Sequence, residues 1–128
     1  MPFATLDIGT NTAQLLVVER EGTTVHRLHA AERFVRLGEG GDASGQIGAA
    51  AQDRLLATLE EHKRVAQEHG AEQIVGAGTS ALRDAANRDA VLDRIQRELG
   101  LSVEILSGAT EAVWSFAAAC AAFDDLTG

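Results

Sequence analysis

The sequence predicts a single α/β domain whose secondary structure runs βββαβαβα. Three apolar segments follow one another near the N-terminus, and later segments with helical spacing each lead into another apolar strand. Consecutive short strands favour an antiparallel meander, whereas helices between strands favour parallel pairing. A chain of 128 residues is long enough for one hydrophobic core and too short for two domains.

The meander is expected over residues 3–8, 13–19 and 23–31. FATLDI reads as a buried strand, AQLLVVE as a second strand rich in Leu and Val, and TTVHRLHAA as a third after the turn EREG. The segment RLGEGGDASGQ at 36–46 has four glycines and no hydrophobic period, so we predict a loop there.

A long helix is predicted over about 46–69, because apolar residues recur along one stripe at helical spacing. Ser44 is expected to cap its start and Gly70 to mark its end. The stripe consists of Ile47, Ala51, Leu55, Leu59 and Ala66, widened by Leu56 and Val65.

The second half alternates strands with helices. Strands are expected over 72–77 and 102–106, and GTSALRDAAN between them predicts a turn and a short helix. Asn87 is then expected to cap a further helix that ends at Gly100. Together with the meander, these elements predict a mixed five-stranded sheet.

A last helix is predicted over 109–123, and its only polar residues are Thr110, Glu111 and Ser115. A helix that is apolar nearly all round is buried or meets a partner. We therefore expect it to be covered either by a further domain of a longer protein or by a second copy of the chain.

The composition of the chain limits the classes of partner and the cellular location that we expect. The net charge of −8 disfavours nucleic acid, whose binding depends on neutralising phosphates. No apolar run has the length that a membrane span needs. Cys120 is the only cysteine, so it forms no intrachain disulfide, and no signal peptide follows Met1. These features predict a cytoplasmic protein that binds neither nucleic acid nor membrane.

The turn between the first two strands, DIGTNT, has the composition of an anion site. Gly9 allows a ligand to approach the backbone closely. The N–H groups of successive small residues can form an anion-binding concavity, and Thr10, Asn11 and Thr12 add side-chain donors. No lysine follows and a strand comes next, so this is not a Walker loop. The alternative is an ordinary hairpin turn.

Asp7, at the end of the first strand, is the candidate ligand for Mg²⁺, held through water as that ion prefers. The histidines do not complete a metal site. His26 and His29 are three residues apart in a strand and so are expected on opposite faces. His62 and His69 share a helix face without a suitable carboxylate. All four are interpreted as surface residues.

A second candidate anion site follows the fourth strand. Thr79, Ser80 and Arg83 lie at the start of a helix, where anions are favoured, and a guanidinium can clamp a phosphate with its planar fork. The alternative for Arg83 is a solvated position or a salt bridge with Asp84 or Asp89.

A third motif, ILSGATEAVW, follows the fifth strand. Ser107 and Gly108 end that strand, and Glu111 lies in the first turn of the apolar helix. An apolar surround would make this carboxylate a stronger base; the alternative is a favourable helix-dipole interaction. Sites in parallel sheets lie beyond the carboxyl ends of the strands, so we expect the three motifs to converge.

These motifs resemble those of a known family. DIGTNT at 7–12 resembles the first phosphate motif of the actin-like phosphotransferase superfamily. In combination with GTSALRDAAN at 78–87, LSGATEA at 106–112 and RLGEG at 36–40, it resembles the exopolyphosphatase / guanosine pentaphosphate phosphatase family. The resemblance covers essentially the whole chain.

The resemblance implies a ribonuclease-H-like βββαβαβα domain of the actin-like ATPase superfamily, with helices on both faces of the sheet. In the family, two such domains face a cleft. The implied reaction is Mg²⁺-dependent release of the terminal phosphate of polyphosphate or of the 5′ phosphate of pppGpp, and both substrates present the same group. Glu111 would activate water, Arg83 would hold the phosphate, the turn at 9–12 would cradle it, and Asp7 would lie near the metal.

Two departures from the family pattern shape the expectation. The family has paired glutamates in the last motif, where this chain has Thr110 and Glu111, and no second glycine-rich phosphate motif of the type DIGGGST occurs. We therefore expect residues 1–128 to be the first domain of a longer phosphohydrolase. The alternatives are a phosphate-binding fragment without turnover and an actin-like domain that self-associates through its last helix.

Overall fold

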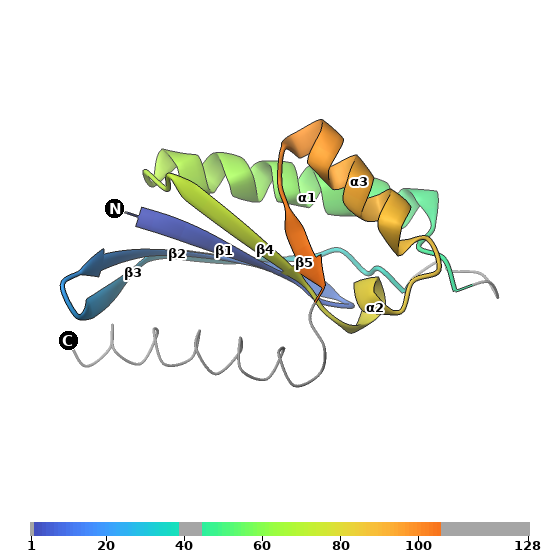
Figure 1. The fold of residues 1–128 in the computed structure, drawn as a ribbon, viewed down its shortest axis with the longest axis horizontal. Helices are drawn as coiled ribbons and strands as arrows, with labels where there is room; N and C mark the ends of the chain where they lie inside the picture. Colours follow the sequence, from blue (N-terminus) through green and yellow to red (C-terminus); the bar gives the residue numbers. More distant parts are fainter. Residues whose placement is uncertain (1, 39–44, 106–128) are drawn as a thin grey trace.

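The computed structural model of the chain describes residues 2–38 and 45–105 (Figure 1). Within these ranges the elements follow the order β1β2β3α1β4α2α3β5, which confirms the predicted order as far as the fifth strand. Several predictions lie outside the described residues, namely the helix at 109–123 with Glu111, the end of the fifth strand at Ser107 and Gly108, and Ser44 and Cys120.

The sheet has five strands in the order β3-β2-β1-β4-β5. β1 pairs antiparallel with β2, and β2 with β3, whereas β1, β4 and β5 run parallel. The predicted meander and the predicted parallel crossovers are therefore both confirmed. The strands are β1 (Pro2–Ile8), β2 (Thr12–Glu21), β3 (Thr24–Phe34), β4 (Gln73–Gly78) and β5 (Val103–Ile105).

The described helices are α1 (Ala49–Glu68), α2 (Ser80–Arg83) and α3 (Arg88–Leu99). Figure 1 shows α1 and α3 on the same face of the sheet, with α2 at the end where β4 stops. No helix within the described residues is long and apolar enough to cross a membrane.

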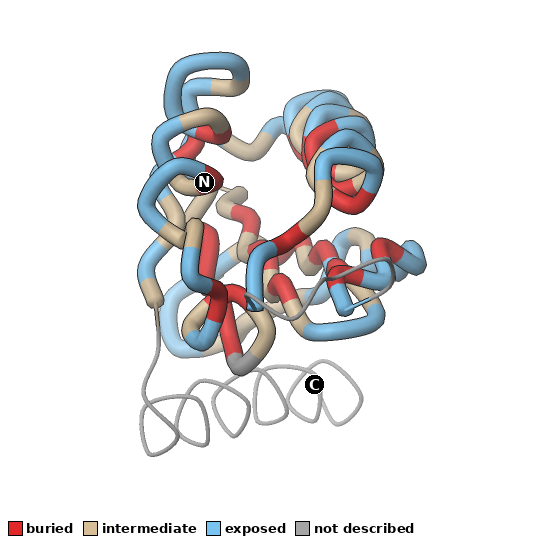
Figure 2. The backbone as a smooth tube through the Cα atoms, turned by 90° about the vertical axis from the view of Figure 1, so that its right-hand side faces the viewer, coloured by how far each residue is buried: buried red, intermediate tan, exposed pale blue. Residues whose placement is uncertain are grey.

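The hydrophobic core lies between this helical layer and the sheet. Alternate residues of β1, namely Ala4, Leu6 and Ile8, are fully buried, and α1 contributes Leu55 and Leu59 of the predicted stripe. Figure 2 shows the buried positions gathered along the strands and on the helix faces turned toward them. The period-2 and period-3.6 patterns of the sequence thus correspond to the faces that meet in the core.

The start of α1 differs from the prediction. The helix begins at Ala49 with Gly48 at the N-cap, later than the predicted start at about residue 46. Hydrogen bonds with Asn87 explain this later start. The Asn87 Oδ1 accepts from the Ile47 N–H at 2.9 Å, and its Nδ2 donates to the Ile47 carbonyl at 3.1 Å. Residue 47 is therefore held in a non-helical conformation by the loop before α3.

The other predicted helix ends match the structure in position. Asn87 stands at the N-cap of α3, although its side chain bonds Ile47 and makes no cap hydrogen bond. Gly70 and Gly100 follow α1 and α3 with φ of 83° and 68°. Both lie in the left-handed region, where the absence of a Cβ removes the steric cost.

The prediction that all four histidines are surface residues is wrong for His62. Its side chain is 1% exposed, and its Nε2 lies 3.0 Å from the carbonyl oxygen of Ala13. A carbonyl only accepts, so Nε2 carries the hydrogen. His62 lies on the apolar stripe of α1, three residues after Leu59 and four before Ala66, which explains its burial.

The expectation that His26 and His29 occupy opposite faces is also wrong. The β2–β3 register shifts by one residue between Val17 and Val18, which places His29 opposite Val17 and His26 opposite Glu19. Positions 17 and 19 share a face, so both histidines share it too. The ring of His29 stacks on that of His69, with centroids 4.6 Å apart.

Candidate functional site

The ends of β1 and β4 bring two of the three predicted motifs together. The parallel register aligns Ile8 with Gly78, so the turn after β1 and the residues after β4 leave the sheet side by side. The N–H and the Oγ1 of Thr79 both donate to the Ile8 carbonyl, at 3.0 Å and 3.1 Å. β5 ends beside them, with Ile105 aligned with Gly78. The third motif continues from there, outside the described residues.

The turn at residues 9–12, here called the phosphate turn, is closed by a hydrogen bond from the Gly9 N–H to the Thr12 carbonyl at 2.9 Å. A Cβ at Gly9 would lie 3.3 Å from that carbonyl oxygen and 3.9 Å from Thr79 Oγ1. Gly9 does not have a positive φ, so space rather than backbone conformation favours glycine here. A side chain at this position would enter the junction between the two motifs.

A third segment supports the phosphate turn from the side. The N–H groups of Val35 and Arg36 donate to the Asn11 carbonyl at 2.7 Å and 3.0 Å, and the Leu37 N–H donates to the Thr10 carbonyl at 2.8 Å. In a planar trans peptide the carbonyl and the next N–H point in opposite directions. The N–H groups of Asn11 and Thr12 are therefore directed away from this segment.

Thr79 has a structural contact that the sequence did not predict. It is 6% exposed, and the hydrogen of its hydroxyl points to the Ile8 carbonyl. A hydroxyl has only one hydrogen to donate, so Thr79 joins β1 to the start of α2 in this arrangement. Ser80 is the first residue of α2. Phosphate binding by Thr79 and Ser80 stays a prediction.

Arg83 ends α2 and has a side chain that is 31% exposed. Its Nε lies 3.4 Å from Oδ1 of the exposed Asp84, so one of the salt bridges considered from the sequence is present. Asp89 lies 3.7 Å from Arg88. An exposed ion pair between neighbouring residues contributes about 0–1 kcal/mol, so a phosphate could compete for the Arg83 guanidinium.

Asp7 lies near the carboxyl end of β1, opposite Gln14 of β2 and Ala77 of β4, and its Oδ1 is buried. No group of three His, Cys, Asp or Glu side chains in 2–38 and 45–105 is arranged to hold a metal ion. Mg²⁺ commonly binds through one or two carboxylates, retained water and substrate phosphates. A single aspartate beside the predicted phosphate turn fits that mode, and Mg²⁺ binding stays a prediction.

Comparison with known proteins gives the family. The model of the Ppx/GppA phosphatase family matches residues 16–127. The chain belongs to this family. Exopolyphosphatase 1 of Mycobacterium tuberculosis is 34% identical over 119 residues, which are 92% of this chain and 35% of that protein. The guanosine-5′-triphosphate,3′-diphosphate pyrophosphatase of Aeromonas hydrophila is 34% identical over 110 residues, which are 86% of this chain and 22% of that protein.

Solved structures of the family share the fold. A crystal structure of an exopolyphosphatase from Cytophaga hutchinsonii superimposes with a TM-score of 0.81 at 35% identity, covering 85% of this chain and 35% of that one. An Aquifex aeolicus Ppx/GppA phosphatase gives a TM-score of 0.79 at 26% identity, covering 84% and 36%. The fold is thus the actin-like ATPase fold of Ppx/GppA proteins, and the chain spans about a third of the length of these relatives.

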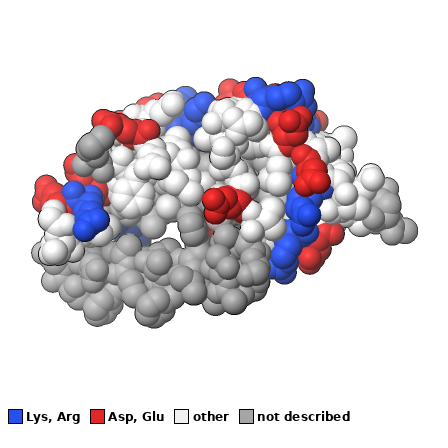
Figure 3. Space-filling model, viewed as in Figure 1, with Lys and Arg blue, Asp and Glu red and all other residues white. Residues whose placement is uncertain are grey.

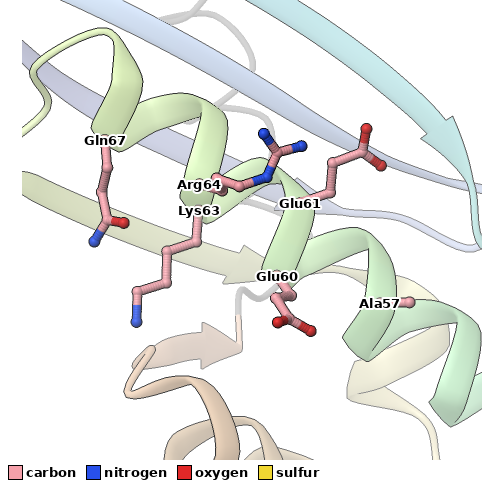
Figure 4. A pocket seen from close by; sticks show the side chains of 6 residues that line it. All are labelled: Ala57, Glu60, Glu61, Lys63, Arg64 and Gln67. Atoms are coloured by element: carbon pink, nitrogen blue, oxygen red, sulfur yellow. The ribbon is translucent and has the colours of Figure 1, made fainter.

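The described surface has a hollow on α1 (Figure 4). Its lining carries both charge signs and none of the predicted site residues; it consists of Ala57, Glu60, Glu61, Lys63, Arg64 and Gln67. Figure 3 likewise shows Lys and Arg side chains next to Asp and Glu side chains over the described part of one face. The predicted site residues that the structure describes lie at the ends of β1 and β4 and in α2, and none of them lines this hollow.

Sequence reasoning noticed RLGEG only through its resemblance to the family. The structure places the start of that motif against the phosphate turn, where Arg36 and Leu37 donate backbone hydrogen bonds. Backbone contacts of this kind leave no pattern in side-chain chemistry. The available signal was the cluster of small residues at Gly38 and beyond, which predicted a loop but not its position.

Proposed function

We propose that this chain is the first domain of a phosphohydrolase that releases the terminal phosphate of inorganic polyphosphate or the 5′ phosphate of pppGpp. The observation that carries the proposal is the junction of the two motifs, where Thr79 donates twice to the Ile8 carbonyl beside the phosphate turn. Family membership and relatives named for these two substrates support the proposal.

The phosphate turn binds the terminal phosphate in this proposal. The N–H groups of Asn11 and Thr12 donate to its oxygens, and the side chains of Thr10 to Thr12 add polar contacts. Arg83 approaches from the end of α2 and donates through its planar fork. These groups would stabilise the negative charge that the phosphoryl group carries during transfer.

Hydrolysis further requires a base and charge neutralisation. Glu111 accepts a proton from the attacking water, which forms the new P–O bond as the bridging P–O bond to the leaving phosphate breaks. Asp7 would hold Mg²⁺ through water, and the ion would supply charge neutralisation on the phosphate oxygens. Each role follows from the motif match and the position of Asp7 at the strand end.

The isolated chain is expected to bind phosphate more readily than it turns substrate over. Electrostatic catalysis of phosphoryl transfer needs stabilising groups on both sides of the transferring group. The chain spans about a third of its relatives, so we propose that a second domain or a second copy, packed on the helix at 109–123, supplies the other side.

The proposal is tested by phosphate release from long-chain polyphosphate with Mg²⁺. The 128-residue chain is compared with Glu111→Gln, which keeps the side-chain volume but loses the base, and with Glu72→Gln as a matched control at the far end of β4. We expect release to fall at least a hundredfold in Glu111→Gln and to be unchanged in the control.

Release at the wild-type rate from Glu111→Gln would remove Glu111 from the reaction. If no protein releases phosphate, equilibrium binding of polyphosphate decides between the remaining readings. Binding without release supports a domain that lacks the other side of its cleft. If the chain neither binds polyphosphate nor releases phosphate from it, the proposed function is contradicted.

A further inference from the structure

Arg54, in the second turn of α1, contacts the segment that supports the phosphate turn. Its Nε donates to the Val35 carbonyl and its Nη2 to the Arg36 carbonyl, both at 3.1 Å. The side chain therefore spans two consecutive carbonyls with its planar fork, a geometry that the single ammonium of lysine does not reproduce.

Val35 and Arg36, whose carbonyls accept from Arg54, direct their N–H groups toward the phosphate turn. Both donate to the Asn11 carbonyl, so the backbone at Val35 and Arg36 lies between the α1 side chain and the phosphate turn. Arg36 has a φ of 49°, in the left-handed region that non-glycine residues seldom adopt. Such a conformation persists only where the surroundings hold it in place.

We propose that Arg54 is a positioning residue for the phosphate turn. Arg54 holds the carbonyls of Val35 and Arg36 from α1, which keeps their N–H groups aligned on the Asn11 carbonyl. That carbonyl is thereby turned away from the ligand, and the N–H of Thr12, on the same peptide, is turned toward it. The inference rests on the proposed function of the turn and assigns Arg54 no contact with the phosphate.

Three variants of the 128-residue chain separate this role from general effects. Arg54→Met removes the fork and the charge, whereas Arg54→Lys keeps the charge without the fork. Arg64→Met is the matched control, because Arg64 lies on the same helix in an exposed pair with Glu68. Each protein is examined by amide hydrogen exchange at residues 10–12 and 35–37 and by calorimetric titration with polyphosphate.

Both Arg54 variants are expected to exchange the amides of Val35, Arg36 and Leu37 faster and to bind polyphosphate roughly tenfold more weakly. The control should match the wild-type chain in both measurements. Wild-type affinity and exchange in Arg54→Met would overturn the inference. Full affinity in Arg54→Lys would also overturn it, because charge alone would then be sufficient.

The two measurements keep this inference separable from the proposed function. A wild-type chain that does not bind polyphosphate contradicts the proposed function. Exchange at residues 35–37 then decides the positioning role by itself: faster exchange in both Arg54 variants supports it, and unchanged exchange overturns it.

Discussion

At the scale of single residues, His62 shows how tertiary contacts alter a side chain's role. Burial lowers the pKa of His62 below its ordinary value of 6.5, and this effect outweighs the hydrogen bond to Ala13 and the nearby Glu61, which act in the opposite direction. Arg33 and His29 also lower the pKa. The folded chain therefore favours the neutral ring, which donates to the Ala13 carbonyl just after the phosphate turn.

This lowered pKa predicts a loss of stability in acid. In the unfolded chain His62 binds a proton as the pH falls through about 6.5, whereas the folded chain resists protonation. The contribution of His62 is thus complete above that pH. Below pH 6.5 this contribution to the free energy of unfolding decreases by up to about 1.4 kcal/mol per pH unit, until the pKa of His62 in the folded chain is reached.

The measurement is urea unfolding of the wild-type chain and His62→Gln between pH 7.5 and 5. Gln keeps an N–H donor and does not titrate. The free energy of unfolding of the His62→Gln variant should therefore decrease less steeply below pH 6.5 than that of the wild-type chain. Parallel curves for the two proteins would exclude His62 as a source of acid sensitivity.

At the scale of elements, α2 depends on the absence of a side chain at the end of β4. A Cβ at Gly78 would lie 2.6 Å from Leu82 Cδ2, 3.3 Å from Leu82 Cβ and 3.1 Å from Ile105 Cδ1. Leu82 is fully buried, so it has little room to move. The close approach of α2 to the sheet, which places Thr79 against Ile8, therefore requires glycine here.

Gly78→Ala is accordingly expected to destabilise the chain by about 1–3 kcal/mol, the usual cost of overpacking a core. Gly38→Ala is the matched control, because the nearest atom to its new Cβ would be Thr10 Cγ2 at 3.9 Å. Thermal unfolding of both variants checks the prediction. Equal melting temperatures would mean that α2 can shift without cost.

The elements themselves could be predicted from hydrophobic period, and the burial of His62 could have been found from its place on the α1 stripe. The contacts that support the phosphate turn could not be predicted from the sequence. The hydrogen bonds of Val35 to Leu37 with the phosphate turn join backbone atoms far apart in sequence, and Arg54 reaches the carbonyls of Val35 and Arg36 from α1. The side-chain pattern of one chain does not encode such pairings.

At the scale of the whole molecule, parallel pairing explains why the first two motifs lie side by side although they are far apart in the sequence. Ile8 of β1 is in register with Gly78 of β4, and Gly78 with Ile105 of β5, so the segments that follow β1 and β4 leave the sheet at the same edge. The general rule for sites in such sheets predicted this from the sequence. The structure confirms it for the first two motifs, and the third lies outside the described residues.

The central claim is that the phosphate turn is the anion site of this domain. Calorimetric titration of polyphosphate into the wild-type chain, Gly9→Val and the surface control Ala57→Val tests it most directly. A valine at Gly9 would begin 3.3 Å from the Thr12 carbonyl oxygen and fill the junction beside Thr79. Ala57 is exposed on α1.

We expect binding to be lost in Gly9→Val and retained in Ala57→Val, with circular dichroism showing that both variants are folded. Unchanged polyphosphate affinity in a folded Gly9→Val would contradict the account.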